Sequence, residues 1–435
     1  MKKIIILLII TTLVFIGCGK KQTKTDRTEV IFWHAMGGPL GAALKGLVED
    51  FNETHPEIHI NAINMGNYTA LSQKLMASIQ TGDQPNIAQA FEAWTANMIE
   101  GDVIMPLDNF IADDPEFGEE DLNDVFQVFR KSNTINGKFM SFPFNKSVQV
   151  LYYNKDMFYQ NGLDPNKPPK TWEEFRKVCK ILTQDTDDDG KIDQYGATLK
   201  ISAWYFENLL LQAGGEILSE DNEPLFNSEE GVKALELITT LLNKDKSAYL
   251  SPGYEGQNDF LASKVGIYID SSVSYAYMQR TGINFNVGIA ALPVDKTRRN
   301  IISGTNVAIF KHDDEKVMKA AWEFVKWFTD TKQTAEWSEK TYYMPVRKSA
   351  LEVEALKQRL ENKPEIQDVY DQLKYATFEP QISEWFEIRK FIEEHAIERV
   401  IRGIYEPEEA LDKAAKELKK KLNETEKKEM KKSKE

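Results

Sequence analysis

Carboxylates crowd one short stretch of the chain, DTDDDGKID, which runs from Asp185 to Asp193. Aspartates occupy every second position, at 185, 187 and 189, and Gly190 follows them. Such spacing, with a glycine that permits a sharp turn, is typical of the first half of an EF-hand calcium loop. The residue at loop position twelve is Gly196, where a bidentate glutamate is usual. The stretch therefore predicts either a structural calcium site or a solvated acidic turn. The calcium ligands would be Asp185, Asp187, Asp189, the carbonyl of Lys191, and Asp193.

Catalytic motifs are missing from the sequence. The chain holds five histidines, but they form no zinc-binding pair, and neither a nucleophile elbow nor a phosphate-binding loop occurs. We therefore expect a protein without catalytic activity and without a required cofactor. The alternative is a secreted carbohydrate-active enzyme, because carboxylates are abundant enough to supply a glycosidase pair.

The N-terminus predicts export and lipid attachment. Lys2 and Lys3 precede an apolar run over residues 4–16, which is short for a membrane span. The run ends in FIGC, which resembles a bacterial lipobox except that leucine is usual at Phe15. We predict a signal peptide over 1–17, a lipid on Cys18 and a polar tether over 18–28. An ordinary signal peptide or an anchor helix is the alternative.

Net charge and cysteine content limit the partners and the disulfide bonds that the chain could have. A formal net charge of −14 argues against nucleic acid as a partner. Once Cys18 carries lipid, Cys179 is left alone, so we predict no internal disulfide and a buried thiol. A length of 435 residues predicts at least two domains. Residues 419–435 form a lysine-rich tail.

The order of elements that must position a site predicts an α/β protein. Apolar strands are expected over 29–36, 57–65 and 86–91, with amphipathic helices over 38–55 and 68–81 between them. This order builds a parallel sheet flanked by helices. Ligands of such sheets bind at the carboxyl ends of the strands, which here are followed by residues 34–38, 65–68 and 91–94.

Two stretches carry a family resemblance, FWHAMGGPLGAALKGLVEDFNETHP and LYYNKDMFYQNGLDPNKPPKTWEEF. They resemble the extracellular solute-binding proteins of bacterial ABC importers, the group that includes the maltose-binding protein. Within that group the chain is most similar to the binders of sn-glycerol-3-phosphate and its diesters, over residues 29–418. The resemblance implies a monomeric, extracytoplasmic, lipid-anchored receptor that delivers a solute to an ABC permease.

The resemblance also implies the architecture, a two-lobed periplasmic-binding-protein fold of type II. Each lobe would hold a central sheet flanked by helices, and hinge bending would close the lobes on a ligand in the cleft between them. The N-terminal lobe would comprise residues 29–143 and 303–347. The C-terminal lobe would comprise residues 144–302 and 348–418.

The pocket residues that the resemblance implies are Tyr68, Glu92, Ser147, Trp204, Ser271, Gly304, Tyr343 and Arg389. Arginine would bind phosphate through two parallel N–H donors, and the hydroxyls and carboxylate would bind further ligand oxygens. Trp204 and Tyr205 stand one residue out of register with the two tryptophans of the glycerol-phosphate binders. The ligand is therefore either a polyol phosphate or a sugar that stacks on these rings.

Overall fold

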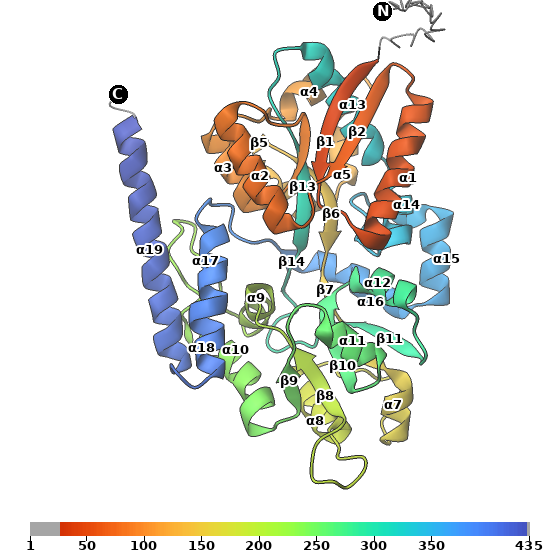
Figure 1. The fold of residues 1–435 in the computed structure, drawn as a ribbon, viewed down its shortest axis with the longest axis vertical. Coiled ribbons are helices and arrows are strands. Elements are labelled where there is room, and N and C mark those ends of the chain that lie inside the picture. The colour runs from red at the N-terminus through yellow and green to blue at the C-terminus, as the bar shows by residue number, and fades with distance from the viewer. Residues whose placement is uncertain (1–26, 433–435) are drawn as a thin grey trace, which may run out of the picture.

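The computed structural model describes residues 27–432, which form two lobes, one above the other in Figure 1. The predicted signal peptide, Cys18 and most of the tether lie outside the described residues. Within the described part of the chain, no helix combines the length and apolar character needed to cross a membrane.

The first lobe is built on a five-stranded sheet. The strand order is β2 (Ile58–Asn64), β1 (Thr28–His34), β3 (Ile87–Ala90), β13 (Ser303–Ile309) and β6 (Phe142–Ser147). β1 pairs in parallel with both β2 and β3, as the β-α-β-α-β order of the sequence predicts. β13 runs antiparallel to β3 and to β6. A strand from far along the chain thus completes the sheet.

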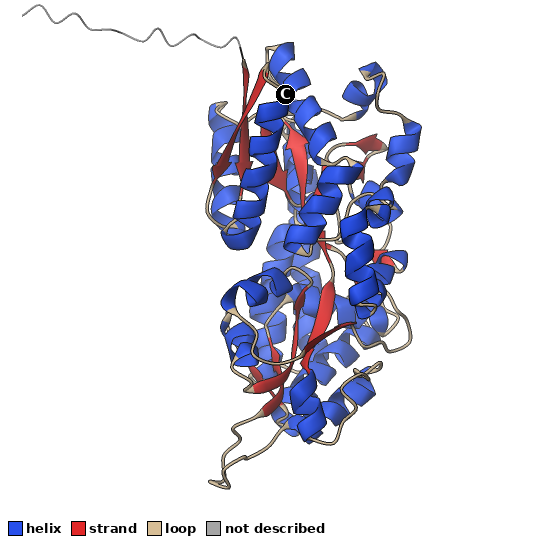
Figure 2. Ribbon diagram, turned by 90° about the vertical axis from the view of Figure 1, so that its right-hand side faces the viewer, coloured by secondary structure: helices blue, strands red, loops and turns tan. Residues whose placement is uncertain are grey.

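The second lobe is built on another five-stranded sheet. Its order is β11 (Val287–Ala291), β7 (Gln149–Asn154), β10 (Val265–Ser271), β8 (Tyr195–Leu199) and β9 (Ala248–Leu250). β8 pairs in parallel with β9 and β10, whereas β7 runs antiparallel to β10 and β11. Figure 2 shows helices packed along both sheets, so each sheet is largely covered by helices.

The chain passes directly from one sheet to the other at Val148, a fully buried residue between β6 and β7. The predicted boundary between the lobes lies at residue 143. In the structure, β6 stays paired with β13 of the first sheet as far as Ser147. A second passage leads from β11 to β13 through β12 (Asn300–Ile301), which pairs with β14 (Ala376–Thr377). The assignment of the remaining segments to lobes stays a prediction.

Helices begin and end where the local sequence predicts. α1 (Gly38–Thr54) ends before Pro56, and α2 (Tyr68–Thr81) ends at Gly82, whose φ of +78° suits a residue without a side chain. α8 (Trp172–Leu182) begins at Thr171, whose hydroxyl accepts a hydrogen bond from the Glu174 N–H. The remaining longer helices, apart from the C-terminal one, are α3 (Glu92–Glu100), α9 (Ala203–Gln212), α10 (Glu229–Thr239), α12 (Ser274–Thr281), α13 (Glu315–Phe328), α14 (Thr331–Thr341) and α15 (Glu354–Asn362).

Shorter elements connect these helices and strands. Two of them, β4 and β5, form a small hairpin in the first lobe. The short elements are β4 (Thr134–Ile135), β5 (Lys138–Phe139), α4 (Asp108–Asp113), α5 (Glu119–Asp124), α6 (Gln127–Ser132), α7 (Lys155–Gln160), η1 (Thr240–Lys244), α11 (Glu255–Leu261), η2 (Ser349–Glu352), α16 (Glu365–Asp371), η3 (Gln372–Lys374), α17 (Trp385–Phe391), η4 (Ile392–Ile397) and α18 (Glu398–Ile401).

The C-terminal helix α19 (Pro407–Lys432) covers one side of the second lobe in Figure 1. Ala410, Leu411, Ala414 and Leu418 on its first turns are fully buried against the core of that lobe. Residues 419–432 of the predicted basic tail continue this helix. The helix is therefore anchored by its N-terminal half.

Close packing in the second lobe explains two features of the sequence. Cys179 on α8 is buried and unpaired, which confirms the prediction of a buried thiol. A Cβ atom at Gly196 would lie 2.3 Å from the Cys179 backbone, so only glycine lets β8 approach α8 this closely. Burial also raises the pKa of the Cys179 thiol well above its ordinary value.

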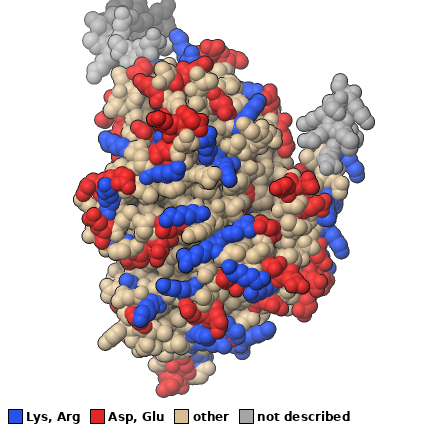
Figure 3. Space-filling model, turned by 180° about the vertical axis from the view of Figure 1, so that it is seen from behind, with Lys and Arg blue, Asp and Glu red and all other residues tan. Residues whose placement is uncertain are grey.

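The surface carries both signs of charge. Figure 3 shows the back of the molecule, where lysine and arginine side chains are interspersed with aspartate and glutamate. Such mixing gives this face no single-signed field that would attract a polyanion. That nucleic acid is no partner stays a prediction from the net charge of −14.

Candidate ligand-binding site

A cleft of about 980 Å³ lies between the two sheets and is lined from both lobes. Its first wall includes the segments that follow β1 and β2, and its second wall includes the ends of β8 and β10. Ligands of α/β sheets bind at these carboxyl ends, so the position agrees with the topology. Six of the eight predicted site residues line the cleft: Tyr68, Ser147, Trp204, Ser271, Gly304 and Tyr343.

Two tyrosines of the first wall are tied together by a buried amide. Asn145 is fully buried, and its Nδ2 donates to the Tyr68 hydroxyl at 3.0 Å and to the Tyr343 hydroxyl at 2.9 Å. The Tyr68 ring meets Phe91 edge to face, with ring centroids 5.0 Å apart. Burial raises the pKa of both tyrosines, so both hydroxyls stay protonated. They are therefore fixed neutral groups that can donate to a ligand.

A glycine with an unusual backbone conformation lines the first wall of the cleft. Gly304 on β13 has a φ of +113°, and a Cβ atom there would lie 1.8 Å from the Asn145 carbonyl oxygen. Only glycine fits this position, and it leaves the backbone open to a ligand. Ser147 pairs with Ser303 in the same ladder, at the end of β6.

The second wall presents Trp204 and Ser271. Trp204 lies in the first turn of α9, which is capped by Ser202, and its ring N–H donates to the Ile301 carbonyl at 2.9 Å. This bond fixes the ring beside β12, at the passage between the lobes. Ser271 ends β10, and its hydroxyl accepts from the Val273 N–H at 3.3 Å. The ring thus lines the cleft from a helix and the hydroxyl from a strand.

Glu92 does not line the cleft. Its carboxylate is 2.7 Å from the ammonium of Lys146, which also donates to the Gly304 carbonyl at 3.2 Å. Lys146 is fully buried and Glu92 nearly so. A buried ion pair of this kind holds α3 against β6 and β13, and Lys146 occupies one of the two carboxylate oxygens of Glu92.

Arg389 does not line the cleft either. It lies on α17 with its Nη1 3.4 Å from Glu379 and its Nε 4.0 Å from Glu207 on α9. The ligand roles of Glu92 and Arg389 stay predictions, because the residues lie beside the cleft in this conformation.

Glu207 is the most unusual member of this charged group. It is 1% exposed, and neither carboxylate oxygen has a hydrogen-bond partner among the described residues. Burial, and next the repulsion of Glu379, raises its pKa well above the ordinary value. Burial likewise raises the pKa of Glu379. Arg389 is therefore shared by two carboxyl groups that resist ionisation.

The structure adds cleft residues that sequence reasoning missed. Lys200, Asp270 and Glu393 are the charged ones, and the rings of Tyr254 and Tyr277 also line the cleft. Lys200 directly follows β8, and Asp270 is the penultimate residue of β10. Position at the carboxyl end of a strand in the second sheet was the signal that could have found these two.

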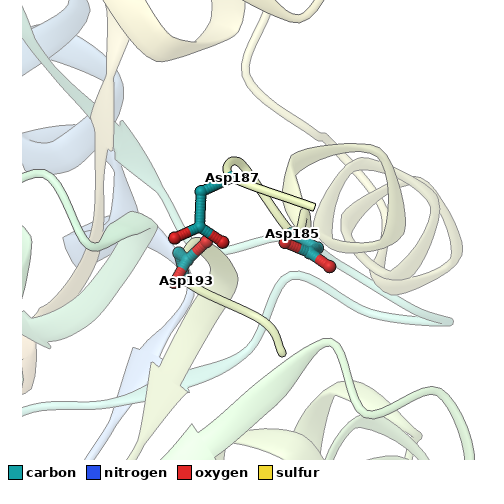
Figure 4. A group of neighbouring side chains, drawn as sticks. All are labelled: Asp185, Asp187 and Asp193. Atoms are coloured by element: carbon teal, nitrogen blue, oxygen red, sulfur yellow. The ribbon is translucent and has the colours of Figure 1, made fainter. Parts of the chain in front are cut away.

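The acidic loop between α8 and β8 lies far from the cleft, at the lower end of the molecule in Figure 1. Figure 4 shows that Asp185, Asp187 and Asp193 gather their carboxylates, which offer oxygens within 4.8 Å of one another. Asp189 instead pairs with its neighbour Lys191, with the ammonium 3.0 Å from one oxygen. None of the loop residues lines the cleft. Calcium binding stays a prediction for this loop.

A family model for bacterial extracellular solute-binding proteins matches residues 46–367. The chain belongs to this family. It is 30% identical to the sn-glycerol-3-phosphate-binding periplasmic protein of Yersinia pestis bv. Antiqua, over 75% of this chain and 76% of that protein. It is 28% identical to the corresponding protein of Escherichia coli, over 89% of this chain and 91% of that one.

Solved structures share the fold. A Mycobacterium tuberculosis protein in complex with glycerophosphocholine superposes with a TM-score of 0.80 at 21% identity, covering 91% of this chain and 99% of that one. A Listeria monocytogenes ABC substrate-binding protein in complex with cycloalternan gives a TM-score of 0.79 at 21% identity, covering 92% and 100%. These similarities confirm the two-lobed α/β fold. The family and the relatives support solute binding and give no support to a secreted enzyme.

Proposed function

We propose that the chain is the lipid-anchored receptor of an ABC importer and captures a polyhydroxylated solute between its lobes. The observation that carries this proposal is the cleft of about 980 Å³, which both sheets line with aromatic rings and fixed hydroxyls. Rings such as Trp204 offer apolar faces to the C–H surface of a sugar or glycerol group, and hydroxyls exchange hydrogen bonds with its oxygens. Closure of the lobes would then remove water from these contacts.

The charges around the cleft favour a solute that is neutral where it meets the second wall. Lys200 is paired with Asp270, and Glu393 adds another carboxylate to the described lining. Arg389, which would bind phosphate, lies between Glu379 and Glu207. An anion entering this site would meet more carboxylates than free cations. This balance favours a sugar.

A glycerophosphodiester is the second candidate, and the sequence relatives favour it. Proteins at 28–30% identity bind sn-glycerol-3-phosphate by name, and one structural relative holds glycerophosphocholine. Both candidates share a polyol. Phosphate binding at Arg389 would have to compete with Glu379 and Glu207 for the guanidinium N–H donors.

The attachment and partners follow from the same role. We propose that Cys18 carries the lipid, that residues 18–28 tether the lobes outside the cytoplasm, and that the receptor acts as a monomer delivering its solute to the permease subunits. Support comes from the FIGC run and from the extracellular family to which the chain belongs.

Calorimetry on the purified chain without its signal peptide tests the proposal. The probes are maltotriose, mannotriose, tagatose, glycerophosphocholine and glycerol-3-phosphate. We expect one of them to bind with a dissociation constant on the order of micromolar, about −8 kcal/mol. Chromatography after incubation should return that probe intact, as expected of a receptor and not of an enzyme. Failure of every probe to bind would overturn the proposal.

A further inference from the structure

An ion pair faces the cleft from the second wall. The ammonium of Lys200 is 2.5 Å from the Asp270 carboxylate, and their side chains are 28% and 20% exposed. β8 and β10 pair in parallel with Ile267 opposite Ala197, and this register places Asp270 opposite Lys200. The pair is therefore set by strand pairing at the rim of the sheet, where it lines the cleft.

Neighbouring groups hold this pair in position. The Tyr268 hydroxyl is 3.2 Å from the Lys200 ammonium and also donates to Asp270. The other Asp270 oxygen accepts from the Ser271 N–H at 2.8 Å. The Lys200 ammonium lies 5.4 Å from the centre of the buried Tyr268 ring. Both charged groups are thus oriented before a ligand arrives, which lowers the entropy cost of binding.

We propose that Lys200 and Asp270 are specificity-determining residues that bind a vicinal diol of the solute. This inference rests on the proposed function and names the part of the ligand that the second wall of the cleft binds. An ammonium donates to one hydroxyl oxygen, and a carboxylate with free lone pairs accepts from the neighbouring hydroxyl. Adjacent hydroxyls lie about a hydrogen-bond length apart, as do the two charged groups of the pair.

The ion pair of Lys200 and Asp270 also disfavours binding of a phosphate at this part of the cleft. A lone lysine would attract a phosphate, but here Asp270 neutralises the ammonium and repels an anion. Removing the charge of Asp270 therefore distinguishes a diol from a phosphate at this position. The change should weaken binding of a diol, whereas it should strengthen binding of a phosphate to Lys200.

The experiment measures the affinity of the Asp270→Asn and Lys200→Met variants for maltotriose, glycerophosphocholine, glycerol-3-phosphate and glycerol-2-phosphate. Glycerol-2-phosphate has no vicinal diol. We expect each variant to lose at least tenfold in affinity for every probe with a vicinal diol that the unaltered protein binds, and to change little in affinity for glycerol-2-phosphate. If glycerol-3-phosphate binds, it should bind more tightly than glycerol-2-phosphate, and Asp270→Asn should abolish the difference.

Lys233→Met and Asp295→Asn are matched controls. The Lys233 ammonium is also 2.5 Å from the Asp295 carboxylate, and neither residue lines the cleft. Neither should change affinity, and the melting temperatures of all four variants show that each is folded. Unchanged affinity in both cleft variants, or tighter binding of glycerol-3-phosphate by Asp270→Asn, would overturn the inference while the proposed function stands. No binding by the unaltered protein of any probe, in this set or among the sugars and phosphates of the first calorimetry, would overturn both.

Discussion

Replacing Glu207 with glutamine should stabilise the protein at neutral pH. Both oxygens of Glu207 are buried without a hydrogen-bond partner among the described residues, and Arg389 Nε is 4.0 Å away. An ionised carboxylate would normally draw an arginine into a shorter, hydrogen-bonded contact. The geometry therefore indicates a protonated carboxyl group, in agreement with its raised pKa. Glutamine reproduces this neutral group at every pH.

The magnitude follows from proton linkage. Because the pKa of Glu207 is raised in the folded state, its contribution to stability is fully present below the ordinary carboxyl pKa of 4.5. It is lost as the pH rises toward the folded-state value, since only the folded protein still holds the proton. The slope is about 1.4 kcal/mol per pH unit. The free energy of unfolding of Glu207→Gln minus that of the unaltered protein should therefore grow with pH above 4.5.

Urea unfolding at several pH values between 4.5 and 8 measures this difference. Asp245→Asn is the matched control, because Asp245 is a well-paired carboxylate. Its hydrogen bonds from Arg176 and Lys180 hold the pKa of Asp245 at about 2. The control should lose about 1–3 kcal/mol at neutral pH, as expected when a charged hydrogen bond is removed. A comparable loss in Glu207→Gln would mean that Glu207 is ionised and paired with Arg389, which would refute the reasoning.

Three further predictions concern the ligand, the loop and the anchor. Trp204→Ala should weaken solute binding about tenfold, or ~1.4 kcal/mol, and more than Arg389→Lys, because only Trp204 lines the cleft; calorimetry that gives the reverse order would indicate a phosphate ligand held by Arg389. Calcium should raise the melting temperature and chelator lower it, with a stabilisation of about 2.7 kcal/mol at a hundred times the dissociation constant. Asp187→Ala should remove this response, and a melting curve indifferent to calcium would leave only an acidic turn. Cys18→Ala should move the protein out of the membrane fraction of the cell, and an unchanged distribution would contradict the lipid anchor.

The local structure of this chain was predictable because it depends on neighbouring residues. Pro56 ends α1, Gly82 ends α2, and Thr171 begins α8, each for a reason visible within a few residues. The parallel part of the first sheet follows from the alternation of strands and helices. The position of β13 in that sheet does not, because its partners lie more than a hundred residues away.

The difference between Trp204 and Arg389 shows where sequence reasoning about a site stops. Trp204 reaches the cleft because its own helix begins there, at Ser202. Arg389 is held by Glu207 and Glu379, and Glu207 comes from a different helix that is distant in the chain. Whether an arginine can bind a phosphate depends on which carboxylates already surround it, and residue type says nothing of that. The buried pair of Lys146 and Glu92 was equally hidden from sequence reasoning, since Lys146 comes from β6 and Glu92 from α3. The role proposed for Lys200 and Asp270 would make ligand selectivity depend on charge pairing across strands and helices more than on the set of residue types.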